Sequence, residues 1–261
     1  MAAPGPRVST ALDGDVWQLA LDAADTGNPL GGVMAGELAD ALAARPARAR
    51  AVLLLSTRRD SPVGGDVQGL AGGDLPGRIA ELSTAWHRVI DAVLHCPVPV
   101  VAGVHGSVAG AGIGLLGACD LVVCGRSTTL HPAYGTLGLT PDGGTSWALT
   151  RALGAPRALE LLLTDGVLNA ADAHTFGLVA RLVDDETLVE QTTALARSIA
   201  AGPVRAMVRT RGLVRRAAIR TLEEQLADEA RLVQESAADA EGREGVAAFL
   251  AGRRPDFRSA R

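Results

Sequence analysis

Short apolar runs alternate with helical patterns along most of this chain, and few folds accept such a pattern. Five Val- and Leu-rich runs, each bounded by turn residues, suit strands that are buried on both faces: residues 16–21, 51–56, 98–104, 121–124 and 178–183. Helical patterns separate or follow them, at about residues 32–44, 78–94, 145–153, 156–163 and 186–201. Strand and helix in turn predict an α/β fold with mostly parallel pairing.

Beyond residue 200 the charge is arranged in two blocks. Residues 203–220 contain six arginines and no acid, whereas residues 221–241 contain seven acids and one arginine. We expect two helices of opposite charge that pack as a pair or reach toward neighbouring subunits. A solvated basic face, or an arginine face beside an anionic ligand, is the alternative. The length of 261 residues fits a core of residues 1–200 with a C-terminal helical region of residues 201–261.

The chain contains no lysine, so its 25 strongly basic residues are all arginines. Pyridoxal enzymes, Walker-type NTPases and protein kinases each need a specific lysine and are excluded. A formal charge of −4 gives no argument for a nucleic acid partner, and no apolar run reaches the roughly 18 residues of a membrane helix. Cys96, Cys119 and Cys124 lie in apolar segments without zinc-like CxxC spacing. With no secretory signal, we expect a cytoplasmic protein with reduced thiols, no metal site and no membrane partner.

Glycines concentrate after two of the predicted strands. Residues 112–117 spell GxGxxG, but the next strand follows too soon for a dinucleotide-binding unit. Residues 144–148 lack the second glycine of a GxSxG nucleophile elbow, which argues against a serine hydrolase. Residues 104–114 instead place free backbone N–H groups at the start of a short helix, and a glycine pair at 64–65 follows another strand. Two such turns could aim two N–H groups at one carbonyl oxygen, as an oxyanion hole does.

Motifs spread along nearly the whole chain match those of one protein family. In chain order they are VGGD (63–66), PVVAGVHG (99–106), GAG (110–112), ACDL (118–121), GLTPDGG (138–144), AADA (170–173) running to GLV (177–179), and the tail at 241–257. The chain thereby resembles the enoyl-CoA hydratase/isomerase (crotonase) superfamily. The resemblance implies a crotonase-type α/β spiral of repeated ββα units, followed by C-terminal helices that trimerise. It also implies an acyl-CoA thioester substrate, no cofactor beyond its coenzyme A moiety, and oxyanion-hole N–H groups at Gly65 and Ala111.

Two carboxylates that the family's hydratases use are missing. The resemblance places them at Gly114 and Tyr134, and neither residue can act as a carboxylate acid or base. Ordinary addition of water to a double bond is therefore not expected. By position, Asp142 matches the Asp that shuttles a proton in dienoyl-CoA isomerases and ring-opening phenylacetyl-pathway isomerases, and that is the nucleophile in 4-chlorobenzoyl-CoA dehalogenase. Alternatively, Asp142 only caps a helix that begins near residue 143.

Three further residues are candidates for the site. The resemblance places His87 at the dehalogenase histidine that activates water, although a lone His on a helix is often structural. Tyr134 is expected to face the acyl group, or to be a core aromatic with its hydroxyl hydrogen-bonded. Without lysine, the CoA phosphates must be met by arginine forks or backbone N–H groups, and Arg211 and its neighbours within residues 205–220 are the candidates.

Three functions follow from these residues. The leading hypothesis is double-bond isomerisation of an acyl-CoA, with the enolate oxygen held by Gly65 and Ala111 and with Asp142 as the proton carrier. The second is dehalogenase-like or hydrolytic chemistry, in which Asp142 attacks and His87 directs water at the resulting ester. The third is binding of acyl-CoA without catalysis. A homotrimer or homohexamer is the assembly that the resemblance implies.

Overall fold

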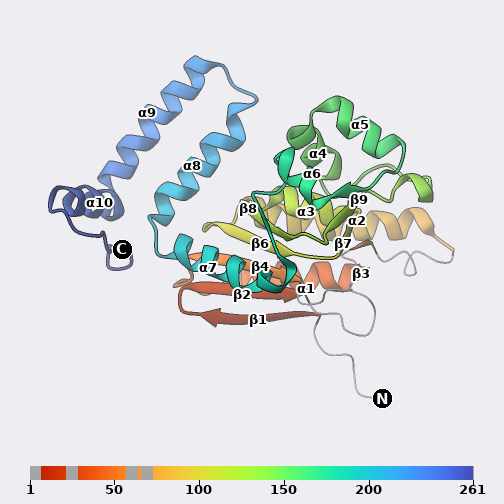
Figure 1. Cartoon of the computed structure of the whole chain (residues 1–261), viewed down its shortest axis with the longest axis horizontal. Coiled ribbons are helices and arrows are strands. Elements are labelled where there is room, and N and C mark those ends of the chain that lie inside the picture. Colours follow the sequence, from red (N-terminus) through yellow and green to blue (C-terminus); the bar gives the residue numbers. More distant parts are fainter. Residues whose placement is uncertain (1–6, 22–28, 57–63, 66–72, 261) are drawn as a thin grey trace.

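A computed structural model describes residues 7–21, 29–56, 64–65 and 73–260, and its centre is a six-stranded sheet (Figure 1). In spatial order, the strands are β1 (Val8–Asp13), β2 (Val16–Leu21), β4 (Ala51–Ser56), β6 (Val100–Val104), β8 (Leu121–Gly125) and β11 (Arg181–Val183). β1 and β2 pair antiparallel, and every other neighbouring pair in this sheet is parallel. Parallel neighbours need long crossover connections, which here contain helices. The predicted α/β class with mostly parallel pairing is confirmed.

Two smaller sheets lie beside the main one. The first contains β7 (Ser107–Ala109), β9 (Thr129–His131) and β10 (Leu168–Asn169), and the second contains β3 (Pro29–Leu30) and β5 (Gly64–Gly65). β5 contacts β7, and it also contacts the helix α3 (Ala111–Ala118), which follows β7 in the chain. The two glycine-rich turns identified in the sequence therefore belong to elements that touch.

Helices cover both faces of the main sheet. Besides α3, the helices of the core are α1 (Gly32–Ala43), α2 (Leu75–Leu94), α4 (Thr145–Leu153), α5 (Ala155–Leu163), α6 (Ala170–Thr175) and α7 (Leu188–Ala200), with short 3-10 helices η2 (Gly135–Leu137) and η3 (Asp185–Thr187). Ala196 and Ile199 of α7 pack on Leu53 and Val101 of the sheet. The opposite face, which includes Leu54, packs in the larger cluster with α1 and α2. β4 is buried on both faces, which is why its sequence is an unbroken apolar run.

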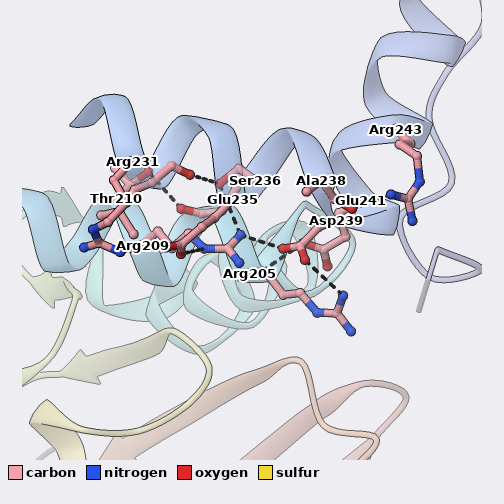
Figure 2. Close-up of polar contacts among 12 residues, drawn as sticks. Arg205, Arg209, Thr210, Arg231, Glu235, Ser236, Ala238, Asp239, Glu241 and Arg243 are labelled. Carbon is pink, nitrogen blue, oxygen red and sulfur yellow. Dashed lines mark hydrogen bonds and ion pairs between the residues drawn. The ribbon is translucent and has the colours of Figure 1, made fainter. Parts of the chain in front are cut away.

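Three helices at the end of the chain extend from one side of the core: α8 (Val204–Ala217), α9 (Leu222–Ala238) and α10 (Ala240–Leu250) (Figure 1). α8 and α9 pack as a pair, as their opposite charges predict. Figure 2 shows part of their contact, where Arg209 Nη1 lies 2.6 Å from Asp239 Oδ2. Farther along the pair, Arg216 and Arg220 both contact Asp228. Part of the basic charge of α8, at Arg209 and Arg216, thus faces acids of α9.

The structure differs from the predicted strands at several boundaries. The strand predicted at residues 98–104 begins at Val100, because Pro99 has no N–H to donate to a ladder. The strand predicted at residues 178–183 shrinks to Arg181–Val183, because the N–H groups of Leu178 and Val179 both donate to the carbonyl of Ala173 in α6. β1 was not predicted, since most of this edge strand is exposed and its sequence is no apolar run.

Candidate active site

The imidazole of His87, on a helix, meets the carboxylate of Asp142, in a loop. α2 carries His87, and Asp142 lies in the loop between η2 and α4. His87 Nε2 is 2.7 Å from Asp142 Oδ1, the length of a strong charge-assisted hydrogen bond. The side chains are 59% and 39% exposed, so a ligand can reach the pair. The capping alternative is not observed, because α4 has Gly144 at its N-cap and receives no side-chain cap from the described residues.

Asp142 is held as an anion. Burial by itself would raise the pKa of its carboxyl, but donors at the Gly143 N–H, His87 and Ser83 lower that pKa below the ordinary value. Ser83 lies one turn before His87 on α2, with its Oγ 3.4 Å from His87 Nε2. Ser83 and Asp142 approach the same ring nitrogen, whereas the serine and acid of a nucleophilic triad contact opposite nitrogens. The cluster therefore presents an ionised carboxylate, not an activated serine.

Tyr134 contacts the backbone of Asp142 rather than its carboxylate. It immediately precedes η2, and its hydroxyl donates to the carbonyl oxygen of Asp142 at 3.0 Å. Burial raises the pKa of the Tyr134 phenol, so the phenol is protonated at neutral pH and available as a donor. Tyr134 thus fixes the loop that presents Asp142, and its predicted contact with an acyl group stays a prediction.

The candidate oxyanion hole lies on the first turn of α3. Ala111 is the first residue of this helix, where N–H groups have no acceptor within the helix. Gly65, the other candidate, ends β5, which contacts α3. A side chain on Gly143 would collide with Ala111 Cβ, so the loop carrying Asp142 packs directly on the same turn. The geometry thus gathers Asp142 and Ala111, together with the strand that carries Gly65.

Gly114, where the resemblance places a hydratase glutamate, has no room for any side chain. A Cβ built on Gly114 would overlap the carbonyl oxygen of Gly143 and lie 3.0 Å from the backbone nitrogen of Thr145. Both are backbone atoms, which cannot turn aside as a flexible side chain would. α3 and α4 approach closely because this glycine lacks a side chain.

Arg211, the predicted ligand of the CoA phosphates, contacts groups of the core in this chain. Its guanidinium donates to the carbonyl of Cys96 at 2.6 Å and lies 3.2 Å from Asp120 Oδ2. Arg215, one turn later, donates to Asp120 Oδ1 at 2.9 Å and to the carbonyl of Ala118 at 2.7 Å. Both side chains therefore fasten α8 to the core, and a role for Arg211 in binding CoA stays a prediction.

Sequence reasoning missed two residues of this site, Ser83 and Thr145. The i, i+4 spacing of Ser83 and His87 on a predicted helix was the available signal for the first. Thr145 is fully buried and donates through Oγ1 to the carbonyl oxygen of Gly110 at 3.0 Å. Nothing in the sequence distinguishes this threonine from one that merely begins a helix.

Two further features were sought in the described ranges. No group of three His, Cys, Asp or Glu side chains there is placed to hold a metal ion. Nor does any helix in them have the length and apolar character needed to cross a membrane.

Comparisons with known proteins relate nearly the whole chain to one family. The family model described as enoyl-CoA hydratase/isomerase matches residues 13–260. A probable enoyl-CoA hydratase of Rhodobacter capsulatus is 34% identical over 92% of this chain and 93% of its own length. The 1,2-epoxyphenylacetyl-CoA isomerase of Escherichia coli is 37% identical over 66% of each chain. The crystal structure of an enoyl-CoA hydratase from Polaromonas sp. JS666 matches with a TM-score of 0.90 and 31% identity, covering 95% of this chain and 98% of that one. The predicted crotonase-type α/β fold with C-terminal helices is confirmed.

Proposed function

Because the chain belongs to the enoyl-CoA hydratase/isomerase family, we propose that it is an enzyme that moves a carbon–carbon double bond in an acyl-CoA thioester, with Asp142 as the proton carrier. The observation that carries this proposal is the Asp142–His87 pair, packed beside the first turn of α3. The two positions of the usual hydratase acids hold Gly114 and Tyr134, so Asp142 is the carboxylate left in place to move a proton.

The proposed reaction begins with the thioester carbonyl accepting hydrogen bonds from the N–H groups of Gly65 and Ala111. Their partial positive charge stabilises the enolate oxygen that forms when the α carbon, or the γ carbon of an α,β-unsaturated thioester, loses a proton. The Asp142 carboxylate takes that proton and becomes a neutral acid, and it returns the same proton to a different carbon. The double bond shifts, and no atom is gained or lost. His87 and Ser83 hold the carboxylate in position through this exchange.

The test of this proposal is Asp142→Asn assayed with 3-enoyl-CoA and 2,5-dienoyl-CoA substrates. General acid–base groups contribute about 10²–10⁴-fold to rate, so kcat is expected to fall at least about a hundredfold. Asp91→Asn is the matched control, because Asp91 is exposed on α2 and pairs only with its helical neighbour His95 among the described residues. Unchanged isomerisation by Asp142→Asn would refute the assigned role.

A second candidate function is favoured by the ionised state of Asp142. A carboxylate whose pKa is lowered is always charged at neutral pH, as a nucleophile must be. In this reaction an Asp142 oxygen bonds to an activated acyl or aryl carbon, and the leaving group departs with its electron pair. The product is an anhydride in the acyl case and an ester in the aryl case, and His87 directs water at this bond, which restores the Asp142 carboxylate. Rapid quench followed by mass spectrometry would detect this covalent adduct as an added mass on Asp142. Turnover of an enoyl-CoA without any adduct would favour isomerisation.

We also propose the homotrimer or homohexamer that the sequence predicts. A cavity of about 810 Å³ opens between α8 and the α3–α4 layer, with Leu116, Trp147 and Met207 among its walls. Exposed apolar side chains continue along α9 and α10, including Phe249. A second copy of the chain would cover such a surface.

Three free, buried cysteines support the predicted cytoplasmic location, because reduced thiols are typical of that compartment. Burial raises the pKa of the Cys124 thiol to about 11, which keeps it unreactive. The proposed reaction requires no cofactor besides the coenzyme A moiety of its substrate, and neither a nucleic acid nor a membrane as partner.

A further inference from the structure

A buried hydroxyl contacts the peptide group that precedes α3. Thr145, the first residue of α4, is completely inaccessible to solvent, and its Oγ1 donates to the carbonyl oxygen of Gly110 at 3.0 Å. The Ile113 N–H donates to the same oxygen, also at 3.0 Å. Both lone pairs of this carbonyl are therefore engaged, which fixes the orientation of the peptide plane.

That peptide plane also contains the Ala111 N–H, because the carbonyl of one residue and the N–H of the next form one rigid unit. Gly110 adopts φ 53° and ψ −127°, a conformation that is essentially restricted to glycine, so its backbone can rotate more freely than that of other residues. The backbone at Gly110 alone is thus a weak constraint on where the Ala111 N–H points. The hydrogen bonds from Thr145 and Ile113 to the Gly110 carbonyl fix the direction of the Ala111 N–H.

The proton of Thr145 is committed to this carbonyl. The hydroxyl of Tyr134 lies 3.4 Å from Thr145 Oγ1, but its single proton has a nearer acceptor in the carbonyl of Asp142 at 3.0 Å. Each hydroxyl therefore donates to a different backbone carbonyl. Thr145 donates to Gly110, just before α3, and Tyr134 donates to Asp142 in the loop before α4.

We propose that Thr145 is a positioning residue for the oxyanion hole, a role that rests on the proposed function. Its hydrogen bond holds the Gly110–Ala111 peptide so that the N–H aims at the thioester oxygen. Withdrawal of electron density at the carbonyl also makes the N–H of the same amide a stronger donor, since linked hydrogen bonds polarise one another. The hydroxyl acts through the peptide and does not touch the substrate.

The test compares side chains that differ only in the hydroxyl group. Thr145→Val replaces the hydroxyl by a methyl group of similar size, and Thr145→Ser keeps the hydroxyl. Removal of a whole oxyanion donor costs about 10²–10³-fold in kcat, so loss of its support is expected to cost about tenfold, with KM changed less than about twofold. Serine is expected to retain most of the wild-type kcat. Should the buried valine prevent folding, Thr145→Ala against Thr145→Ser gives the same comparison.

A spectroscopic measurement separates positioning from packing. The probe is butanoyl-CoA labelled with ¹³C at the carbonyl, which binds without a double bond to move. Its infrared carbonyl stretch is expected to fall on binding to the wild type and Thr145→Ser, and to return at least halfway to the solution value in Thr145→Val and Thr145→Ala. An equal shift in all four proteins, or a serine variant as impaired as valine, would overturn the role of Thr145. No shift in the wild type would instead overturn the proposed oxyanion hole and this role with it.

Discussion

Gly114 ties the missing hydratase acid to the position of the remaining one. The space that a side chain at Gly114 would need is filled by the backbone carbonyl of Gly143, the residue after Asp142. A glutamate at Gly114 would therefore displace the loop that brings Asp142 to His87. A side chain at Gly114 and the present position of Asp142 therefore exclude each other, because α3 and the loop before α4 are in close contact.

Gly114→Ala is accordingly expected to lower the free energy of unfolding by about 1–3 kcal/mol, the usual cost of overpacking a tight contact, and to reduce isomerisation by shifting Asp142. Gly36→Ala is the matched control, because Gly36 also lies in a helix but a Cβ there meets open space. It is expected to be neutral or to stabilise by about 0.5–1 kcal/mol. Urea unfolding measures the free energy of unfolding of both variants. Equal stability of the two variants would contradict the steric argument.

At this scale the sequence predicted the residues whose chemistry is distinctive. Asp142 and His87 stand out by type and motif position, and the structure places them in contact. Hydroxyl residues carry no such signature, because serines and threonines also begin helices and cover surfaces, so Ser83 and Thr145 were missed. The partner of Thr145 is a distant peptide group that only tertiary packing defines. Ser83 has its partner one helix turn away, but its role depends on Asp142, which tertiary packing brings to the same imidazole.

Among the elements, α8 illustrates how a charged helix can have a structural function. Asp120, at the end of α3, accepts the Val100 N–H and both Arg211 and Arg215. Each guanidinium also donates to backbone carbonyls at the edge of the core, such as that of Cys96. An arginine guanidinium can donate to several acceptors in one plane, which explains why the contact between α8 and the core uses arginine side chains.

Arg211→Lys tests this interpretation against binding of CoA phosphates. Lysine cannot span the carbonyl of Cys96 and Asp120 in the same way, so we expect a loss of about 1–3 kcal/mol in the free energy of unfolding. An unchanged dissociation constant for CoA in this variant would confine Arg211 to the structural role. Arg126→Lys serves as the control, because Arg126 forms a well-exposed ion pair with Asp184, and it is expected to change stability by less than about 1 kcal/mol. Calorimetric titration showing weaker CoA binding by Arg211→Lys at wild-type stability would instead support the phosphate role.

The elements also show why part of the fold was predictable. Strands with both faces buried, such as β4, need apolar residues at nearly every position, so an unbroken apolar run in the sequence predicts them. The two-residue strands β3 and β5 have no pattern of their own, and they exist because tertiary contacts bring their backbones together.

In the molecule as a whole, a buried ion pair fixes the C-terminal helices to the sheet. Arg50, just before β4, donates to the carbonyls of Ala200 and Gly202 and to the carboxylate of Glu241 at 3.0 Å. Glu241 is only 3% exposed and also accepts the Arg205 N–H at 2.9 Å. These bonds join the start of β4, the end of α7 and the first turns of α8 and α10. The C-terminal helices therefore have a defined direction within one chain.

A fixed direction gives the apolar surface of α10 a definite place in an assembly. Phe249 and Leu250 are 84% and 80% exposed in the single chain, and burying such a side chain contributes roughly 1.5–3 kcal/mol. In a closed ring each copy contributes the same contact, so the loss on substitution is repeated at every interface.

We expect Phe249→Asp to convert a trimer or hexamer to the monomer at micromolar concentration. Val33→Asp, at an exposed apolar position of α1, is expected to leave the assembly intact. Sedimentation equilibrium measures the mass of each assembly. An unchanged mass for Phe249→Asp would exclude α10 from the interface, and a monomeric wild type would exclude the assembly itself.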